Sequence, residues 1–316
     1  MTDAVSSSDP ADLPSPAVGT EASAALLAAE AGGAVRQARL WSDAWRNLRR
    51  SPLFLAGALI LLVLSVMAVA PGLFTDVDPR ATELALSRRP PSADAWFGHD
   101  VQGHDYYSYV VHGARVSMII GLLVVGGSMV IGLVLGALAG YYGGWVDGLI
   151  ARLTDIAFGL PLILGAILIL AVLDQRGVLQ VSIALILLSW MVPLRLVRSS
   201  VIAVKDADYV QAAKALGATD SRILLRHILP NALAPVLVHS TITVGVIITA
   251  EATLSYLGVG LQLPEISWGL MINSAQKYIT TAPHLLFFPG AFLAVTVLAF
   301  IMIGDALRDA LDPKLR

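Results

Sequence analysis

The sequence predicts an all-α integral membrane protein with about six transmembrane helices. Of its 316 residues, 56% are hydrophobic and 14% are charged, whereas a soluble domain carries roughly 25% charged residues. Uncharged stretches of about the 20 residues that a membrane-spanning helix needs recur along the chain. The chain has no cysteine, which excludes disulfides, thiol catalysis and cysteine-ligated metal sites.

Six uncharged runs account for the expected spans. They are 53–70, 116–146, 156–173, 177–194, 228–250 and 285–304. The second run is longer than one span needs, and it ends in the turn-forming sequence Tyr141-Tyr142-Gly143-Gly144. Charged residues border the shorter runs. Their side chains can reach the membrane surface while their backbone lies within the span, so these residues add to the length of the span.

The placement of Lys and Arg predicts the orientation of the chain, since loops on the cytoplasmic side carry an excess of basic residues. With the N-terminus in the cytoplasm, 15 of the 21 basic residues lie on the cytoplasmic side, 5 lie outside, and Arg115 lies at the boundary. The sequence therefore predicts that both termini and the loop 206–231 face the cytoplasm.

The segment before the first span divides into two parts. Residues 1–34 are rich in Ala, Ser, Pro and Gly, which predicts a disordered cytoplasmic tail. Residues 35–50 predict an interfacial amphipathic helix, with Trp41 and Trp45 one turn apart and basic residues that reach anionic headgroups. We do not expect cleavage after Ala70, because the basic start is long and further spans follow.

The remaining chain divides at the outer loop 71–114. Residues 51–112 hold the first span and most of this loop, residues 113–307 hold the other spans, and residues 308–316 form a cytoplasmic C-terminus. His99, Asp100, His104, Asp105 and His112 suggest a metal-site hypothesis for the loop. Their spacing matches no standard metal motif, and two Gly-His-Asp sequences are typical of turns. We therefore favour a folded loop over a metal site.

Glycine and ionisable residues mark positions of interest within the membrane. Gly132, Gly136 and Gly140 recur every four residues, and we expect this stripe to serve close helix packing inside the chain. Ionisable residues near a membrane are candidates for structural or gating roles. The candidates here are Arg115, Asp147, Arg152, Asp155, Glu251 and Asp305. Arg152 and Asp155 stand at i, i+3 and are expected to pair. All lie near span ends, which argues against a proton relay.

The loop 206–231 begins with a predicted helix that suits docking. Residues 206–216 contain no Gly or Pro, which favours a helix. Tyr209, Ala212, Ala213 and Leu216 share one apolar face of it. Small residues permit close approach to a groove on a protein, whereas a helix lying on lipid presents bulky apolar side chains. We therefore favour docking onto a partner protein over binding to lipid.

The same loop predicts a second short helix. Gly217 is a natural stop for the first helix. Thr219 or Asp220 is expected to cap a helix over 221–229, and Pro230 then begins the fifth span.

At these residues the chain resembles the EAA-type coupling motif of ABC importer permeases. The matching residues are Ala212-Ala213, Gly217 and Ile228-Leu229-Pro230. From about residue 40 onward the chain is similar to the C-type permease subunit of dipeptide and oligopeptide importers. The blocks that carry this likeness are 113–117, 139–144, Asp147, Arg152, Asp155, Pro161, 250–258, 267–269 and 304–313.

The resemblance implies a type I ABC importer permease fold in a bacterial cytoplasmic (inner) membrane. It implies a heterodimer with a second permease subunit, two cytoplasmic ATPase subunits that use ATP and Mg, and an extracytoplasmic substrate-binding protein that delivers di- or oligopeptides. The ATPase-coupling residues that it implies are Tyr209, Gln211, Ala212, Ala213, Leu216 and Gly217. Gln211 departs from the family Glu, and His99 and His104 replace other residues of the outer-loop pattern.

The sequence predicts a transport subunit rather than an enzyme, with no cofactor, metal or nucleic acid bound. No Lys follows a Gly, so the GxxxxGK[ST] phosphate loop is absent and ATP must be used by other chains. One alternative keeps the architecture but changes the cargo to nickel, haem or another small solute. Another is an intramembrane hydrolase, which would need paired carboxylates or a facing Ser/His pair. His239 and Ser240 are adjacent rather than facing.

Overall fold

The computed structural model describes residues 45–311 apart from 174, and within them the chain is built from helices and loops. Four helices are long and apolar enough to span a membrane: α2 (Pro52–Val69), α3 (Tyr106–Tyr142), the continuous helix Asp220–Tyr256 and α12 (His284–Leu311). Two bent pairs also qualify as spans: α4 (Gly144–Phe158) with α5 (Leu162–Val172), and α6 (Val178–Leu187) with α7 (Met191–Val204). The predicted all-α membrane fold with about six spans is confirmed.

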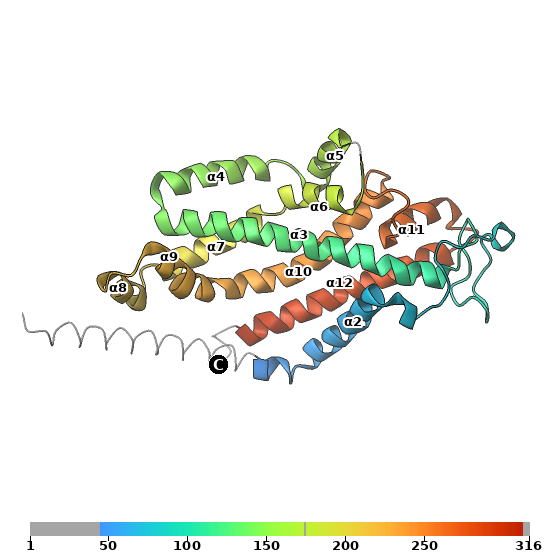
Figure 1. The fold of residues 1–316 in the computed structure, drawn as a ribbon, viewed down its shortest axis with the longest axis horizontal. Coiled ribbons are helices and arrows are strands. Elements are labelled where there is room, and N and C mark those ends of the chain that lie inside the picture. The colour runs from blue at the N-terminus through green and yellow to red at the C-terminus, as the bar shows by residue number, and fades with distance from the viewer. Residues whose placement is uncertain (1–44, 174, 312–316) are drawn as a thin grey trace, which may run out of the picture.

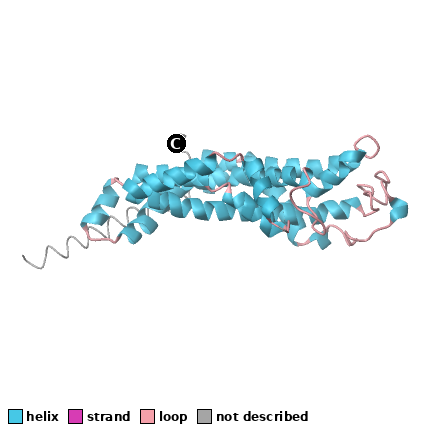
Figure 2. Cartoon of the chain, turned by 90° about the horizontal axis from the view of Figure 1, so that it is seen from above, coloured by secondary structure: helices cyan, strands magenta, loops and turns pink. Residues whose placement is uncertain are grey.

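The long helices lie side by side along the long axis of the molecule (Figure 1). α3 packs on α7 and on α10 (Leu229–Tyr256), while α12 packs on α2 and α10. One end of the bundle carries α8 (Asp208–Ala215) and α9 (Asp220–Arg222), and we name it the α8 end. The other carries α11 (Trp268–Ala275) and the loop 70–105, and we name it the α11 end. A view turned by 90° shows that much of the loop structure gathers at the α11 end (Figure 2).

Local sequence explains where the long helices begin and end. Ser51 caps α2 by accepting a hydrogen bond from the Phe54 N–H, and Asp105 caps α3 by accepting one from the Ser108 N–H at 2.8 Å. Each cap satisfies a backbone donor that a helix start leaves unpaired. α3 ends at Gly143, which has a φ of 64°, a conformation that favours glycine. The sequence 141–144 therefore ends the helix as expected.

The glycine stripe of α3 packs against α7, which confirms the expectation of packing within the chain. A Cβ added at Gly132 would lie 2.8 Å from the Leu194 nitrogen, and one at Gly136 would lie 2.6 Å from the Leu194 oxygen. At Gly140 the added atom would lie 2.9 Å from the Arg198 oxygen. Only glycine lets the two backbones approach this closely.

The expected span 156–173 is not one unbroken helix. α4 begins at Gly144, before the uncharged run, and meets α5 at an angle of 87°. Pro161 precedes the first residue of α5, and proline disfavours the helical conformation of the residue before it. Gly159 adds a second weak point, since glycine loses more backbone freedom in a helix than other residues do.

The expectation of a separate second helix over 221–229 is also wrong. α9, a π-helical turn η3 (Ile223–Ile228) and α10 follow each other directly, and together they form one helix from Asp220 to Tyr256. Pro230 lies in the first turn of α10, directly after η3. Inside a regular α-helix, proline has no N–H to donate to the carbonyl at i−4, and its ring clashes with that carbonyl. In a π-helical turn the hydrogen bonds run i→i+5 instead, so the wider turn before Pro230 removes both problems.

Several predictions concern residues outside the described part of the chain. The predicted tail 1–34, residues 35–44 of the predicted interfacial helix, and residues 312–316 lie there. Within the described part, the Arg49 guanidinium lies 4.7 Å from the centre of the Trp45 ring.

Candidate functional site

α8 is held against the bundle by one face. Val210 and Ala213 are buried, with 0% and 4% of their surface exposed. They belong to an apolar cluster with Val197 and Val201 of α7 and Ile228 of η3. The sequence grouped Ala213 with the docking residues, but its side chain faces the bundle and anchors α8. Val210, which the sequence analysis did not single out, is the other anchor.

The opposite face of α8 is exposed. The exposed coupling candidates are Tyr209, Gln211, Leu216 and Gly217, while Ala212 is half-buried. Gly217 has a φ of 78°, and its N–H donates to the Lys214 oxygen at 3.0 Å. This geometry confirms Gly217 as the predicted helix stop. Burial raises the pKa of Tyr209, so its phenol stays protonated at neutral pH, and its oxygen accepts a hydrogen bond from Asn231.

A polar contact joins the loop helices to the end of α3. The Tyr141 hydroxyl donates to the Asp220 carboxylate at 2.6 Å, and the Lys214 ammonium lies 5.9 Å from the centre of the Tyr141 ring. α8 and α9 are thus both in contact with α3, in addition to the apolar contact with α7. In the sequence, Tyr141 stands out only as part of a turn. Nothing in its spacing indicates a partner 79 residues away.

Two ion pairs join α4 to α7. The Arg198 guanidinium donates two hydrogen bonds to the Asp147 carboxylate, at 2.5 and 2.6 Å. Arg195 donates to Asp155 at 2.9 Å and lies over the Phe158 ring at 4.2 Å. The expected pairing of Asp155 with Arg152 is therefore wrong. α4 turns back along the bundle after Gly143, which brings its acidic residues to basic residues of α7.

A buried polar cluster joins α10 to α11 at the α11 end. Glu251 is fully buried, and one of its oxygens accepts hydrogen bonds from Ser255 at 2.8 Å and from Ser267 at 3.2 Å. Ser267 also caps α11, and Ser255 accepts from the Leu261 N–H at 3.1 Å. A buried carboxyl group is stabilised by such partners. Glu251 thus holds the segment between the two helices.

Trp268 brings α3 into the same cluster. Its indole is fully buried, and Nε1 donates to the Val110 oxygen at 3.0 Å. A Cβ added at Gly113 would lie 3.2 Å from the indole ring, and the Trp268 N–H donates to the Ser117 hydroxyl at 3.3 Å. The blocks 113–117, 250–258 and 267–269 therefore meet in space, although they lie far apart in the sequence.

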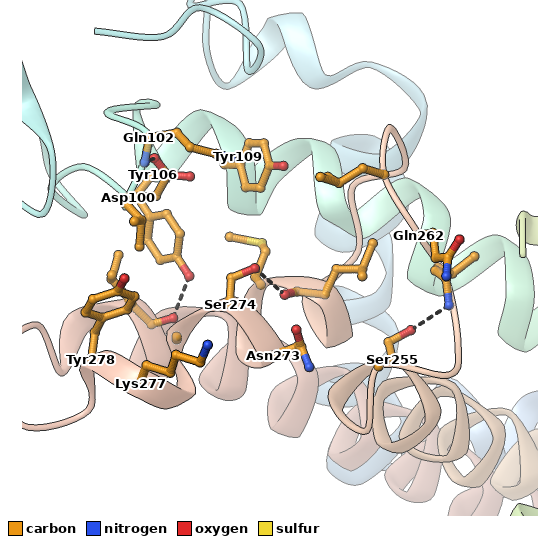
Figure 3. A pocket seen from close by; sticks show the side chains of 18 residues that line it. Asp100, Gln102, Tyr106, Tyr109, Ser255, Gln262, Asn273, Ser274, Lys277 and Tyr278 are labelled. Carbon is orange, nitrogen blue, oxygen red and sulfur yellow. Dashed lines mark hydrogen bonds between the residues drawn. The ribbon is translucent and has the colours of Figure 1, made fainter. Parts of the chain in front are cut away.

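Beside this cluster lies a cavity of about 680 Å³. Figure 3 shows Asp100, Tyr106 and Tyr109 on one side, facing Asn273 and Lys277 on the other. Ser255 and Gln262 lie at one end of the space. The cavity has both apolar and polar walls, which is the character of a small-molecule site. No pattern in the sequence indicates it, since its lining residues come from four separate stretches, 100–109, 255–263, 270–278 and 285.

The outer loop uses its His and Asp side chains in turns and caps. Asp100 and His104 form a contact of 2.7 Å, Asp105 caps α3, and His112 Nδ1 contacts the Ser108 oxygen at 2.9 Å. Within residues 45–173 and 175–311, no group of three or more His, Cys, Asp or Glu residues is placed to hold a metal ion. The loop is folded, as the turn interpretation expects.

The remaining candidates lie on exposed faces. Arg115 lies on α3, Arg152 on α4 and Asp305 on α12, and all three are exposed. The structure does not bring them together with each other or with Glu251.

These features define a multi-pass membrane protein with broken spans, a loop helix anchored to the bundle, and a polar cluster with a cavity at the opposite end. Residues 132–316 match the family described as binding-protein-dependent transport system inner membrane component. Residues 39–91 match the N-terminal transmembrane domain of oligopeptide transport permease C. The chain belongs to this family of permeases and is a multi-pass inner-membrane protein.

Similar proteins cover most of the chain. A dipeptide transport system permease protein of Alkalihalophilus pseudofirmus is 40% identical over 281 residues, which are 87% of this chain and 90% of that protein. An oligopeptide transport system permease protein of Bacillus subtilis is 39% identical over 293 residues, covering 92% and 96%. A glutathione transport system permease protein of Escherichia coli is 40% identical over 277 residues, covering 87% and 91%.

A solved structure shares the fold. It is described as an amino acid ABC transporter with histidines, and it superimposes with a TM-score of 0.50 at 16% identity. The match covers 63% of this chain and 92% of that one.

Proposed function

We propose that this chain is a transmembrane subunit of an ATP-driven importer of dipeptides and oligopeptides, with its α8 end in the cytoplasm. The observation that carries the proposal is the similarity of nearly the whole chain to dipeptide and oligopeptide permeases. Nickel or haem as cargo is not favoured, because the relatives reported above are named for other substrates.

The coupling site is the exposed face of α8 together with Gly217. Separate ATPase subunits bind there, one of them on this chain and one on a second permease subunit. A substrate-binding protein delivers the peptide at the α11 end. The excess of basic residues at the α8 end supports this orientation.

The contacts of α8 suggest how the movement of an ATPase reaches the spans. When ATP binding closes the ATPases, they displace α8. The buried Val210 and Ala213 transmit the displacement to α7, and Tyr141 transmits it to α3. Because two ion pairs join α7 to α4, these helices move as one rigid body.

The proposal is tested in a bacterial strain that lacks the gene and requires an amino acid supplied only as a dipeptide. Wild-type chain restores growth and ATP-dependent uptake of the dipeptide. Leu216→Asp places a charge on the exposed face of α8 and abolishes uptake, while the chain still inserts into the membrane. Gln211→Glu, on the same helix, introduces the residue that the family pattern has and keeps uptake.

Uptake that survives the loss of the whole chain would contradict the proposed cargo. Uptake that survives depletion of ATP would contradict the proposed energy source. Normal uptake by Leu216→Asp would contradict the proposed coupling face alone.

A further inference from the structure

The cavity at the α11 end is enclosed by two walls from distant parts of the chain. One wall is formed by residues 100–109, which lead into and begin α3. The other is formed by α11 and the following turn η4 (Gln276–Tyr278). Figure 3 shows polar side chains from both walls around one space. With the proposed orientation, this space lies on the side from which the cargo arrives.

The volume of the cavity suits a small ligand. It measures about 680 Å³, within the range of roughly 300–1,000 Å³ that small-molecule sites occupy. Apolar lining residues include Leu261, Leu270 and Met271, which can contact an apolar side chain. The cavity is too large for a single inorganic ion and is lined on too many sides by apolar groups to favour one.

The charged group that is open to a ligand in this cavity favours an anionic group. Asp100 and Lys277 are the acidic and basic lining residues. The Asp100 carboxylate is already occupied, because it accepts hydrogen bonds from the Gln102 N–H and the His104 N–H at 2.8 Å and contacts His104 Nδ1 at 2.7 Å. Lys277 forms no hydrogen bond or ion pair with another residue of the described ranges 45–173 and 175–311. Its ammonium is therefore available to a ligand.

Further polar groups stand near Lys277. The Arg88 guanidinium lies 5.3 Å from the centre of the ring of Tyr278, a lining residue, and adds positive charge on this side. The Asn273 amide nitrogen donates to the Tyr256 oxygen at 2.6 Å, and the Asn273 oxygen accepts no hydrogen bond from another residue in the described part of the chain. An acceptor on the same wall as a cation is matched by a ligand that has both an N–H group and a carboxylate.

We propose that this cavity is a peptide-binding site within the permease itself, in which Lys277 contacts the C-terminal carboxylate of the peptide. Asn273 accepts a hydrogen bond from a peptide N–H, and the apolar wall contacts a peptide side chain. This inference rests on the proposed function as a peptide importer. It assigns a specificity role to the permease, in addition to that of the binding protein that delivers the cargo.

The test is equilibrium binding of a radiolabelled alanyl-phenylalanine dipeptide to the purified permease–ATPase complex in nanodiscs, without the binding protein. The wild-type complex binds the dipeptide saturably. Lys277→Ala weakens binding about tenfold, the loss expected for one charge-assisted hydrogen bond, and Lys277→Arg restores most of it. The C-terminally amidated dipeptide binds the wild-type complex as weakly as the free acid binds Lys277→Ala.

Arg89→Ala is the matched control. Arg89 is an exposed basic residue at the same end of the molecule but does not line the cavity, so its loss leaves binding unchanged. Equal effects of Arg89→Ala and Lys277→Ala would overturn the proposal in favour of a general surface charge effect. An equal loss for the free acid and the amide on Lys277→Ala would also overturn it.

Other results separate this inference from the proposed function. Absence of saturable binding by a complex that imports peptides normally in the strain described above would overturn the inference and leave the importer intact. If Lys277→Ala instead weakens only the docking of the binding protein, the cavity is a protein interface and the proposal fails.

Discussion

Replacing Gly136 by alanine tests whether the close contact of α3 and α7 holds the permease together. The added Cβ would lie 2.6 Å from the Leu194 carbonyl oxygen and 2.8 Å from the Val197 Cβ. Ordinary contacts lie at 3.4–4 Å. The two helices must therefore separate by about 0.8 Å at this point, and a backbone oxygen has no alternative rotamer that would relieve the contact.

The expected cost is about 1–3 kcal/mol, the usual range for overpacking a well-packed interior. Helix propensity acts in the opposite direction, since alanine is favoured over glycine by roughly 1 kcal/mol in a helix. Gly126 of the same helix provides a matched control, because a Cβ added there has no atom within 4 Å. The propensity gain is common to both variants, so their difference isolates the packing cost.

The measurement is thermal unfolding of the purified complex in detergent. Tm is expected to be lower for Gly136→Ala than for Gly126→Ala by about 1 °C or more, because the shift of roughly 2–4 °C per kcal/mol for 150–250 residues is smaller for a 316-residue chain. Because α7 leads into α8, peptide uptake is also expected to fall in Gly136→Ala only. Equal Tm values for the two variants would refute the reasoning that the α3–α7 contact requires glycine.

Three further variants test other contacts of the structure. Tyr141→Phe removes the hydrogen bond to Asp220 and is expected to lower the amount of peptide taken up per ATP hydrolysed. The same ratio should stay unchanged in the neighbouring Tyr142→Phe. An unchanged ratio in both variants would argue against a role of the Tyr141–Asp220 contact in coupling. Glu251→Ala leaves two buried serines without their acceptor and is expected to destabilise the complex by about 2–4 kcal/mol. Glu251→Gln keeps an acceptor oxygen and is expected to be more stable than Glu251→Ala. Equal thermal stability of the two variants would contradict the role of Glu251 as an acceptor. In Gly217→Ala the alanine must adopt a positive φ of 78°, which costs about 1 kcal/mol. Peptide uptake is therefore expected to fall more than in Gly217→Asn, since asparagine tolerates this conformation. A larger fall in Gly217→Asn would disprove the role of the backbone conformation.

Composition and local pattern predict much of this fold. A membrane span depends on a run of apolar residues within one segment, so the sequence locates all four unbroken spans, with ends that differ from those of the structure by up to 10 residues. The end of α3 at Gly143, expected from the turn-forming sequence 141–144, likewise depends on a conformation within one turn. The helix 206–216 with its stop at Gly217 is of the same kind, since the structure places α8 at Asp208–Ala215.

The errors at 156–173 and at 221–229 have local causes. Gly159 and Pro161 stand inside an uncharged run, and hydrophobicity alone cannot show that the helix breaks there by 87°. Pro230 suggests a break by the usual rule, but the π-helical turn before it lets the helix continue.

The candidate site depends more on tertiary structure. The spacing predicts that Tyr209, Ala212, Ala213 and Leu216 share one face of the helix. In a helix of eight residues, however, the elements that pack against it decide which side chains are covered. α7 and η3 cover Val210 and Ala213 and leave Tyr209 and Leu216 exposed.

The sequence by itself determined the class of protein, the approximate positions of the spans and the loop helix that stops at Gly217, because these follow from composition and from residues within a few turns of each other. Only the tertiary structure decided which residues pair with Asp147, Asp155 and Tyr141. These partners lie 51, 40 and 79 residues away in the chain, respectively. The cavity is decided in the same way. Its walls are formed by segments more than 150 residues apart, and their meeting depends on how α3, α10 and α11 pack around Trp268 rather than on any local pattern.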